Sequence, residues 1–132
     1  MNASTRVSFQ GSHVLVVHPD GYEITPDALG VSWMRMGEAC RQHGCYKVLV
    51  DSPATVRKEM RQAEAYQSAI QAMEALHGAT VALCFPDYVP DELSGFFKLA
   101  AANRGVQVEF FQSRETALRW LGVGPEDDQG AA

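Results

Sequence analysis

An aspartate and a serine follow one apolar run of the sequence, and a carboxylate beside a hydroxyl can do chemistry. Asp51 and Ser52 come directly after "VLV" and precede Pro53. A serine there could act as a nucleophile if a base and an oxyanion hole lay within hydrogen-bond reach. The stretch "VDSPA" is not a G-x-S-x-G elbow, although a triad can assemble from distant histidines. The simpler interpretation is a local backbone hydrogen bond from Ser52 where a strand meets a turn.

Zinc-type ligands also occur close together, at Cys40, His43 and Cys45. Three such residues across a helix end, with no second pair, make a weak zinc signal, and a buried thiol at the end of a helix explains Cys40 better. No Gly-rich phosphate loop follows any apolar run. We therefore predict no metal and no cofactor, and a reducing compartment would keep the three cysteines as thiols.

Polar residues follow two apolar runs that we expect to be neighbouring parallel strands. Asp51, Ser52 and Thr55 follow the first, and Asp87 and Tyr88 follow "TVALCFP". The carboxyl ends of parallel strands share one edge of a sheet, and ligands commonly bind there. These five residues are therefore our candidate ligand or partner site.

The elements that position these residues are predicted from periodicity and from helix start and stop signals. Strands and helices alternate, which indicates parallel pairing and right-handed crossovers. The predicted fold class is α/β, a single domain with an N-terminal β-hairpin, β/α repeats and a mostly parallel five-stranded sheet. The domain covers residues 1–122, and residues 123–132 form an acidic tail that we expect to be disordered. The expected elements are a hairpin in residues 6–19, helices in 26–43, 56–77, 91–104 and 114–121, and strands in 46–52, 80–86 and 106–111.

The three later strands alternate between two faces, whereas strands covered by helices on both faces are continuously apolar. This pattern predicts helices mainly on one face and an incompletely covered second face. That face would be a contact surface, most simply in a homodimer, because an apolar centre with a polar rim is typical of interfaces. Ordinary solvent exposure, or cover by the N-terminal segment and a loop, is the alternative. The predicted interface has Leu49, Ala82 and Cys84 at its centre and Lys47, Thr80, Gln107 and Glu109 around them.

The element order, the strand end "VLVD", the strand "TVALCF" and above all "AANRGVQVEFFQSRETALRWLG" resemble the SpoIIAA-like proteins. These are small bacterial relatives of the STAS domains of anti-sigma-factor antagonists and anion transporters. The resemblance covers about residues 6 to 122 in organisation and implies strands in sequential order. The specific matches lie in the C-terminal part, at Asn103, Arg104, Gly105, Val106, Phe110 or Phe111, Ala117, Trp120 and Leu121.

The phosphorylation switch of the antagonists does not carry over to this chain. Their strand-end aspartate, matched by Asp51, is followed several residues later by an Asp-Ser-Ser-Gly motif with a phosphorylated serine. The corresponding positions here read "TVRKEM", in which Thr55 is the only hydroxyl and lacks the glycine context.

Composition narrows the possible functions. The 132 residues are 46% apolar and 20% charged, as in soluble globular proteins, and the net charge of −5 argues against a nucleic-acid partner. No signal-peptide pattern and no membrane-spanning run is present, so we expect a cytoplasmic protein without a membrane partner.

We expect a non-catalytic regulatory or protein-interaction module, not an enzyme, that binds a protein partner or itself. The alternative is a carrier of a small hydrophobic ligand or lipid in an apolar cleft between helices. Core packing accounts equally well for its candidate lining. Trp120, beside the apolar stripe of the last helix, is expected to be largely packed. The candidate lining is Trp33, Met36, Tyr66, Met73 and Phe96.

Overall fold

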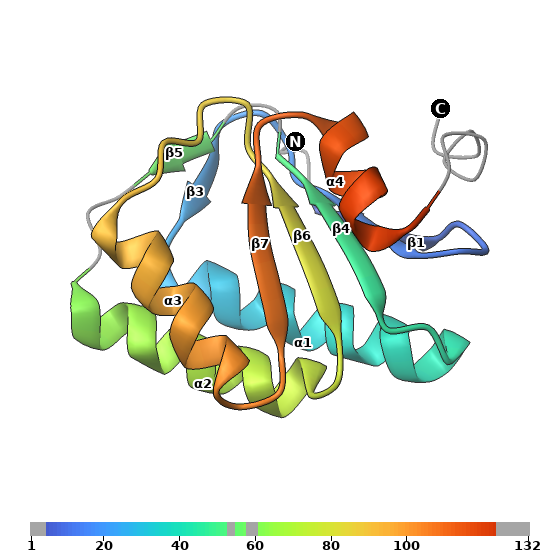
Figure 1. Cartoon of the computed structure of the whole chain (residues 1–132), viewed down its shortest axis with the longest axis horizontal. Coiled ribbons are helices and arrows are strands. Elements are labelled where there is room, and N and C mark those ends of the chain that lie inside the picture. The colour runs from blue at the N-terminus through green and yellow to red at the C-terminus, as the bar shows by residue number, and fades with distance from the viewer. Residues whose placement is uncertain (1–4, 53–54, 58–60, 124–132) are drawn as a thin grey trace.

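A five-stranded sheet runs through the middle of the molecule, with its strands in the order β1-β2-β4-β6-β7 (Figure 1). The structure is a computed structural model and describes residues 5–52, 55–57 and 61–123. The first two strands form an antiparallel hairpin, and each later strand adds in parallel. The predicted mostly parallel α/β sheet is confirmed. The strands are β1 (Arg6–Phe9), β2 (Val14–Val17), β4 (Lys47–Asp51), β6 (Thr80–Cys84) and β7 (Gln107–Phe111).

Three helices cover one face of this sheet, here called the first face (Figure 1). They are α1 (Pro26–His43), α2 (Gln62–Leu76) and α3 (Glu92–Ala102). Side chains of alternate strand residues, among them Val48, Val50 and Val81, fill the layer beneath them. The starts of α1 and α3 agree with the start signals in the sequence, because Thr25 accepts the N–H of Ala28 and Asp91 accepts that of Ser94.

The fourth helix, α4 (Arg114–Leu121), covers the centre of the opposite, second face. Ala117, Leu118 and Leu121 of α4 pack with the three apolar strand residues predicted to be an exposed interface centre. Leu49 and Ala82 have no exposed surface and Cys84 is 2% exposed. The prediction of an open apolar centre on this face is therefore wrong, because the chain's own last helix occupies it.

Two short parallel strands form a second sheet, β3 (Tyr22–Ile24) and β5 (Thr55–Arg57). The sequence predicts neither strand, and it places the start of the second helix near Val56. Residues 55–57 are instead extended because they pair with β3, and α2 begins at Gln62. Three residues with no strong pattern of their own are thus placed by a tertiary contact.

Val123 lies one residue beyond the predicted end of the domain. Val123 is 5% exposed and packs with the second-face core. The predicted disordered tail, residues 124–132, lies outside the described residues. None of the described helices is both long enough and apolar enough to cross a membrane.

Candidate functional site

The residues predicted to gather at the carboxyl edge point in different directions. Asp51 faces α4, where its Oδ2 lies 3.2 Å from an Nη of Arg114. Ser52 faces the first-face layer and is 1% exposed. Its N–H donates to the Cys84 carbonyl, and its Oγ has no hydrogen-bond partner within the described part of the chain. The local backbone hydrogen bond predicted for the Ser52 hydroxyl is therefore not found within the described residues, although Ser52 does lie at the end of a strand.

The other predicted members of this site lie elsewhere. Asp87 is exposed, whereas Tyr88 turns toward the outer edge of the sheet, where its ring stacks on Phe110. Thr55 lies in β5, and its side chain is outside the part that the structure describes. The structure therefore does not bring the side chains of Asp51, Ser52, Asp87 and Tyr88 together into one site.

His18 lies beside the end of β4, since its N–H donates to the carbonyl of Asp51. Its imidazole Nδ1 lies 2.8 Å from Thr5 Oγ1, and the ring stacks on Tyr22 at 3.8 Å between centroids. Burial lowers the pKa of His18 from its ordinary value of 6.5 to about 4, and the nearby charge of Arg35 contributes to the lowering. The imidazole is therefore neutral in the folded protein near neutral pH.

The lowered pKa of His18 predicts that the free energy of unfolding decreases as the pH is lowered. Below its ordinary pKa the unfolded chain takes up a proton that folded His18 does not accept until about pH 4. Neutral His18 therefore contributes its full share to the free energy of unfolding above pH 6.5. That contribution declines as the pH falls, by about 2 kcal/mol between about pH 7 and pH 5. Urea unfolding at several pH values measures it. In His18→Gln, which cannot titrate, the decline should be smaller by that amount, and equal declines in both proteins would contradict the assignment.

The cysteine and histidine group in residues 40–45 does not converge. Cys40 is buried in the first-face core, the ring of His43 stacks on Phe9 at 4.4 Å, and the Cys45 thiol donates to the Ser12 carbonyl. Burial, with a smaller contribution from Cys45, raises the pKa of the Cys40 thiol to about 11. Within residues 5–52, 55–57 and 61–123, no three potential ligands lie together so as to hold a metal ion.

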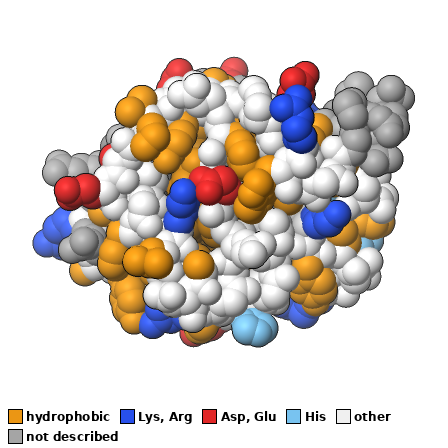
Figure 2. Space-filling view, viewed as in Figure 1, with side chains coloured by type: hydrophobic (Ala, Val, Ile, Leu, Met, Phe, Trp, Pro, Cys, Tyr) orange, Lys and Arg blue, Asp and Glu red, His pale blue; other side chains and the backbone are white. Residues whose placement is uncertain are grey.

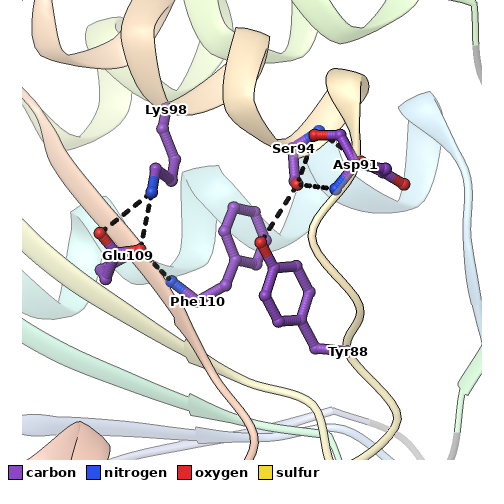
Figure 3. A network of polar contacts seen from close by, with 6 residues as sticks. All are labelled: Tyr88, Asp91, Ser94, Lys98, Glu109 and Phe110. Atoms are coloured by element: carbon purple, nitrogen blue, oxygen red, sulfur yellow. Dashed lines mark hydrogen bonds and ion pairs between the residues drawn. The ribbon is translucent and has the colours of Figure 1, made fainter.

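A connected network of polar and aromatic contacts lies instead along the outer side of β7 (Figure 3). Lys98 of α3 reaches across to Glu109 of β7, with Nζ at 2.8 and 3.1 Å from the two carboxylate oxygens. The Tyr88 hydroxyl lies 3.2 Å from Ser94 Oγ, and Ser94 in turn bonds Asp91 at the start of α3. The network thereby joins the loop after β6, α3 and the edge strand.

Beside this network lies a shallow depression of about 570 Å³ between α3, the amino half of β7 and α4. Leu99 on one side is 62% exposed, and Trp120 on the other is 39% exposed. On this face of the molecule a basic and an acidic side chain adjoin, with apolar patches around them (Figure 2). We call this hollow the edge groove; it is lined by Thr80, Gly95, Lys98, Leu99, Ala102, Gln107, Val108 and Trp120.

The edge groove retains part of the interface predicted from the sequence. Thr80 and Gln107 line the groove, and Glu109 adjoins it through its contact with Lys98. Lys47 of β4 is exposed, and its side chain lies near Gly122 at the end of α4. The prediction that Trp120 is largely packed is wrong, although its ring contacts Phe111 at 5.5 Å. Sequence analysis missed Lys98 and Leu99; the only signal was a lysine beside an outward leucine on an otherwise apolar helix.

The residues considered for an apolar cleft lie mainly in the core. Trp33 and Met36 are 2% and 1% exposed, and Met73 packs against the same core. Tyr66 is 39% exposed and accepts a hydrogen bond from Arg104, while its ring lies 6.2 Å from that of Phe96. Core packing therefore accounts for Trp33, Met36 and Met73.

These features define a small single-domain α/β protein with a partly apolar groove at one sheet edge. Neither a protein-family model nor a curated protein matches the chain.

Proposed function

We propose that this protein is a non-catalytic regulatory or protein-interaction module of the SpoIIAA-like type, without the phosphorylatable serine of the antagonists. The observation that carries the proposal is the edge groove, where two large apolar side chains, Leu99 and Trp120, are exposed on either side of a shallow hollow. Exposed aromatic and aliphatic anchors around a hollow are typical of protein contact sites.

A second copy of the chain is the partner that the charges favour. Lys98 and Glu109 lie side by side, each with 35% of its side chain exposed. A surface that carries one cation next to one anion is self-complementary, because a two-fold axis can place Glu109 of each copy near Lys98 of the other. The apolar anchors on either side would then be buried in the same contact.

The test is a charge placed at the exposed apolar anchor. Leu99→Asp would desolvate a carboxylate in the contact, so we expect dimer dissociation to become at least about tenfold easier. Sedimentation equilibrium of the wild type and the variant measures the dissociation constant. Met34→Asp is the matched control, since Met34 is 56% exposed on α1 and lies outside the edge groove. A wild type that sediments as a monomer at micromolar concentration would rule out the homodimer.

The alternative, a carrier of a small apolar ligand or lipid, would use the same hollow. Its lining is partly apolar, with Leu99, Val108 and Trp120 among the residues that an apolar ligand could contact. Native mass spectrometry of protein purified from its host separates the two functions. A retained small molecule supports the carrier, and a retained protein chain supports the interaction module.

A further inference from the structure

The outer edge of β7 is an unpaired strand edge within the described sheet, because β7 is its last strand. The N–H of Gln107 donates to Ala79, and the carbonyl of Phe111 accepts from Phe85. Hydrogen-bonding direction alternates along a strand, so the backbone groups of Val108 and Phe110 point away from the sheet. Such free edges are templates for pairing with another chain.

We infer that Glu109, held by Lys98, closes this edge against strand pairing. The Phe110 N–H, one of the two outward donors, is already occupied because it donates to Glu109 Oε1 at 3.2 Å (Figure 3). The same carboxylate oxygen accepts from Lys98 Nζ at 2.8 Å, and this contact holds the side chain over the edge. An incoming strand would have to displace this carboxylate from a donor and a cation together.

Glu109 also opposes the register that a second copy would use. An antiparallel pair of β7 strands that engages both outward residues places Val108 of each copy opposite Phe110 of the other. Glu109 of one copy would then lie directly opposite Glu109 of the second copy, and like charges at such positions are destabilising. The side chain thus blocks a donor and also places two carboxylates face to face in the competing dimer.

This inference does not rest on the proposed function. The proposed contact uses the side chains of Leu99 and Trp120 and the charges of Lys98 and Glu109, whereas the closed edge concerns backbone pairing along β7. A protein that is monomeric in its wild-type form can still have a closed edge.

The experiment replaces the carboxylate with a residue that favours strands. Glu109→Val frees the Phe110 N–H and removes the opposed charges, and valine suits an extended backbone, so the fold should be retained. We expect the hydrogen-exchange rate of the Phe110 amide, measured by NMR at low protein concentration, to become about tenfold faster. At high concentration the variant should self-associate more strongly than its parent, and association should slow the exchange of the Val108 and Phe110 amides.

Glu115→Val is the matched control. It removes the same charge and adds the same apolar side chain on an exposed face of α4, where the Glu115 carboxylate pairs with Arg119. Glu115→Val should neither self-associate more strongly than the wild type nor change the amide hydrogen-exchange rates in β7. Association by both valine variants would indicate a general effect of charge and would overturn the assignment to the edge.

The same substitution in the Leu99→Asp background separates this inference from the proposed function. New association of the double variant relative to Leu99→Asp supports the closed edge whether or not the wild type dimerises through the edge groove. Unchanged association and unchanged Phe110 exchange on Glu109→Val, in both backgrounds, would overturn the closed edge and leave the proposed dimer to its own test.

Discussion

Ala82→Glu should destabilise the fold by about 4 kcal/mol or more, because an unpaired carboxylate would be buried between β6 and α4. Ala82 has no exposed surface, and its neighbours in this layer are apolar side chains such as Leu49, Leu118 and Leu121. The glutamate must either become protonated or force α4 off the sheet. Urea unfolding followed by circular dichroism measures the loss of free energy.

Gln107→Glu is the control for this substitution, since Gln107 lies on the neighbouring strand and is exposed. It adds the same charge at a wetted position and should change the free energy of unfolding by less than about 0.5 kcal/mol. From the sequence alone, Ala82→Glu is expected either to dissociate a dimer or to be nearly silent. A stable, folded Ala82→Glu protein would show that α4 does not cover this residue in solution.

Gly37→Ala should cost about 3 kcal/mol or more, because α1 and α2 approach each other too closely at this glycine for any side chain. A Cβ atom at Gly37 would lie 2.2 Å from the carbonyl oxygen of Ala75. That oxygen belongs to the backbone of α2 and cannot rotate away, so the helices must separate and the core must repack. Thermal unfolding should show a clear decrease in the melting temperature.

Gly95→Ala is the matched control in α3. A Cβ atom there would meet nothing within 4 Å, so only the backbone preference changes. Alanine should then stabilise the helix by about 0.5–1 kcal/mol. If both alanine variants behaved alike, the close approach of α1 and α2 at Gly37 would be absent from the folded protein.

The tests at the sheet edge distinguish two kinds of contact. Leu99→Asp probes an association made by side chains, and Glu109→Val probes one made by the backbone. Lys98 and Glu109 belong to both surfaces, because they carry the two charges of the proposed contact and because Lys98 holds Glu109 over the Phe110 amide. Substituting Lys98 alone would therefore not separate the two contacts, and Glu109→Val separates them when it is made in the Leu99→Asp background.

Local signals determined most of the secondary structure. Thr25 followed by Pro26 predicts the start of α1, and Gly44 predicts its end; the structure has that glycine in the left-handed conformation. The alternation in β4, β6 and β7 predicts two distinct faces, and the order of elements predicts parallel pairing. Capping, chain reversal and side-chain alternation depend on residues within a few positions of one another, so they can be recognised in the sequence.

The placement of α4 was decided only in the tertiary structure. Each of the first three helices is followed by another parallel strand, and the right-handed crossover rule assigns such helices to one face. α4 follows β7, after which the described chain adds no strand, so that rule does not apply to it. Its apolar stripe could pack on either face, and the uncovered residues of the second face were the available partner. The pattern in the strands therefore identified an apolar surface correctly but could not say that the chain itself would cover it.

The separation of the predicted site residues has a similar cause. Asp51 and Ser52 are neighbours in sequence, yet they point to opposite faces because side chains alternate along an extended backbone. Arg114 pairs with Asp51 only because α4 crosses the second face, and Lys98 reaches Glu109 only because α3 lies beside the edge strand. The sequence by itself determined the elements and the apolar faces of this protein. The ion pairs, the closed edge and the exposed groove join residues far apart in the chain, so only the tertiary structure decided them.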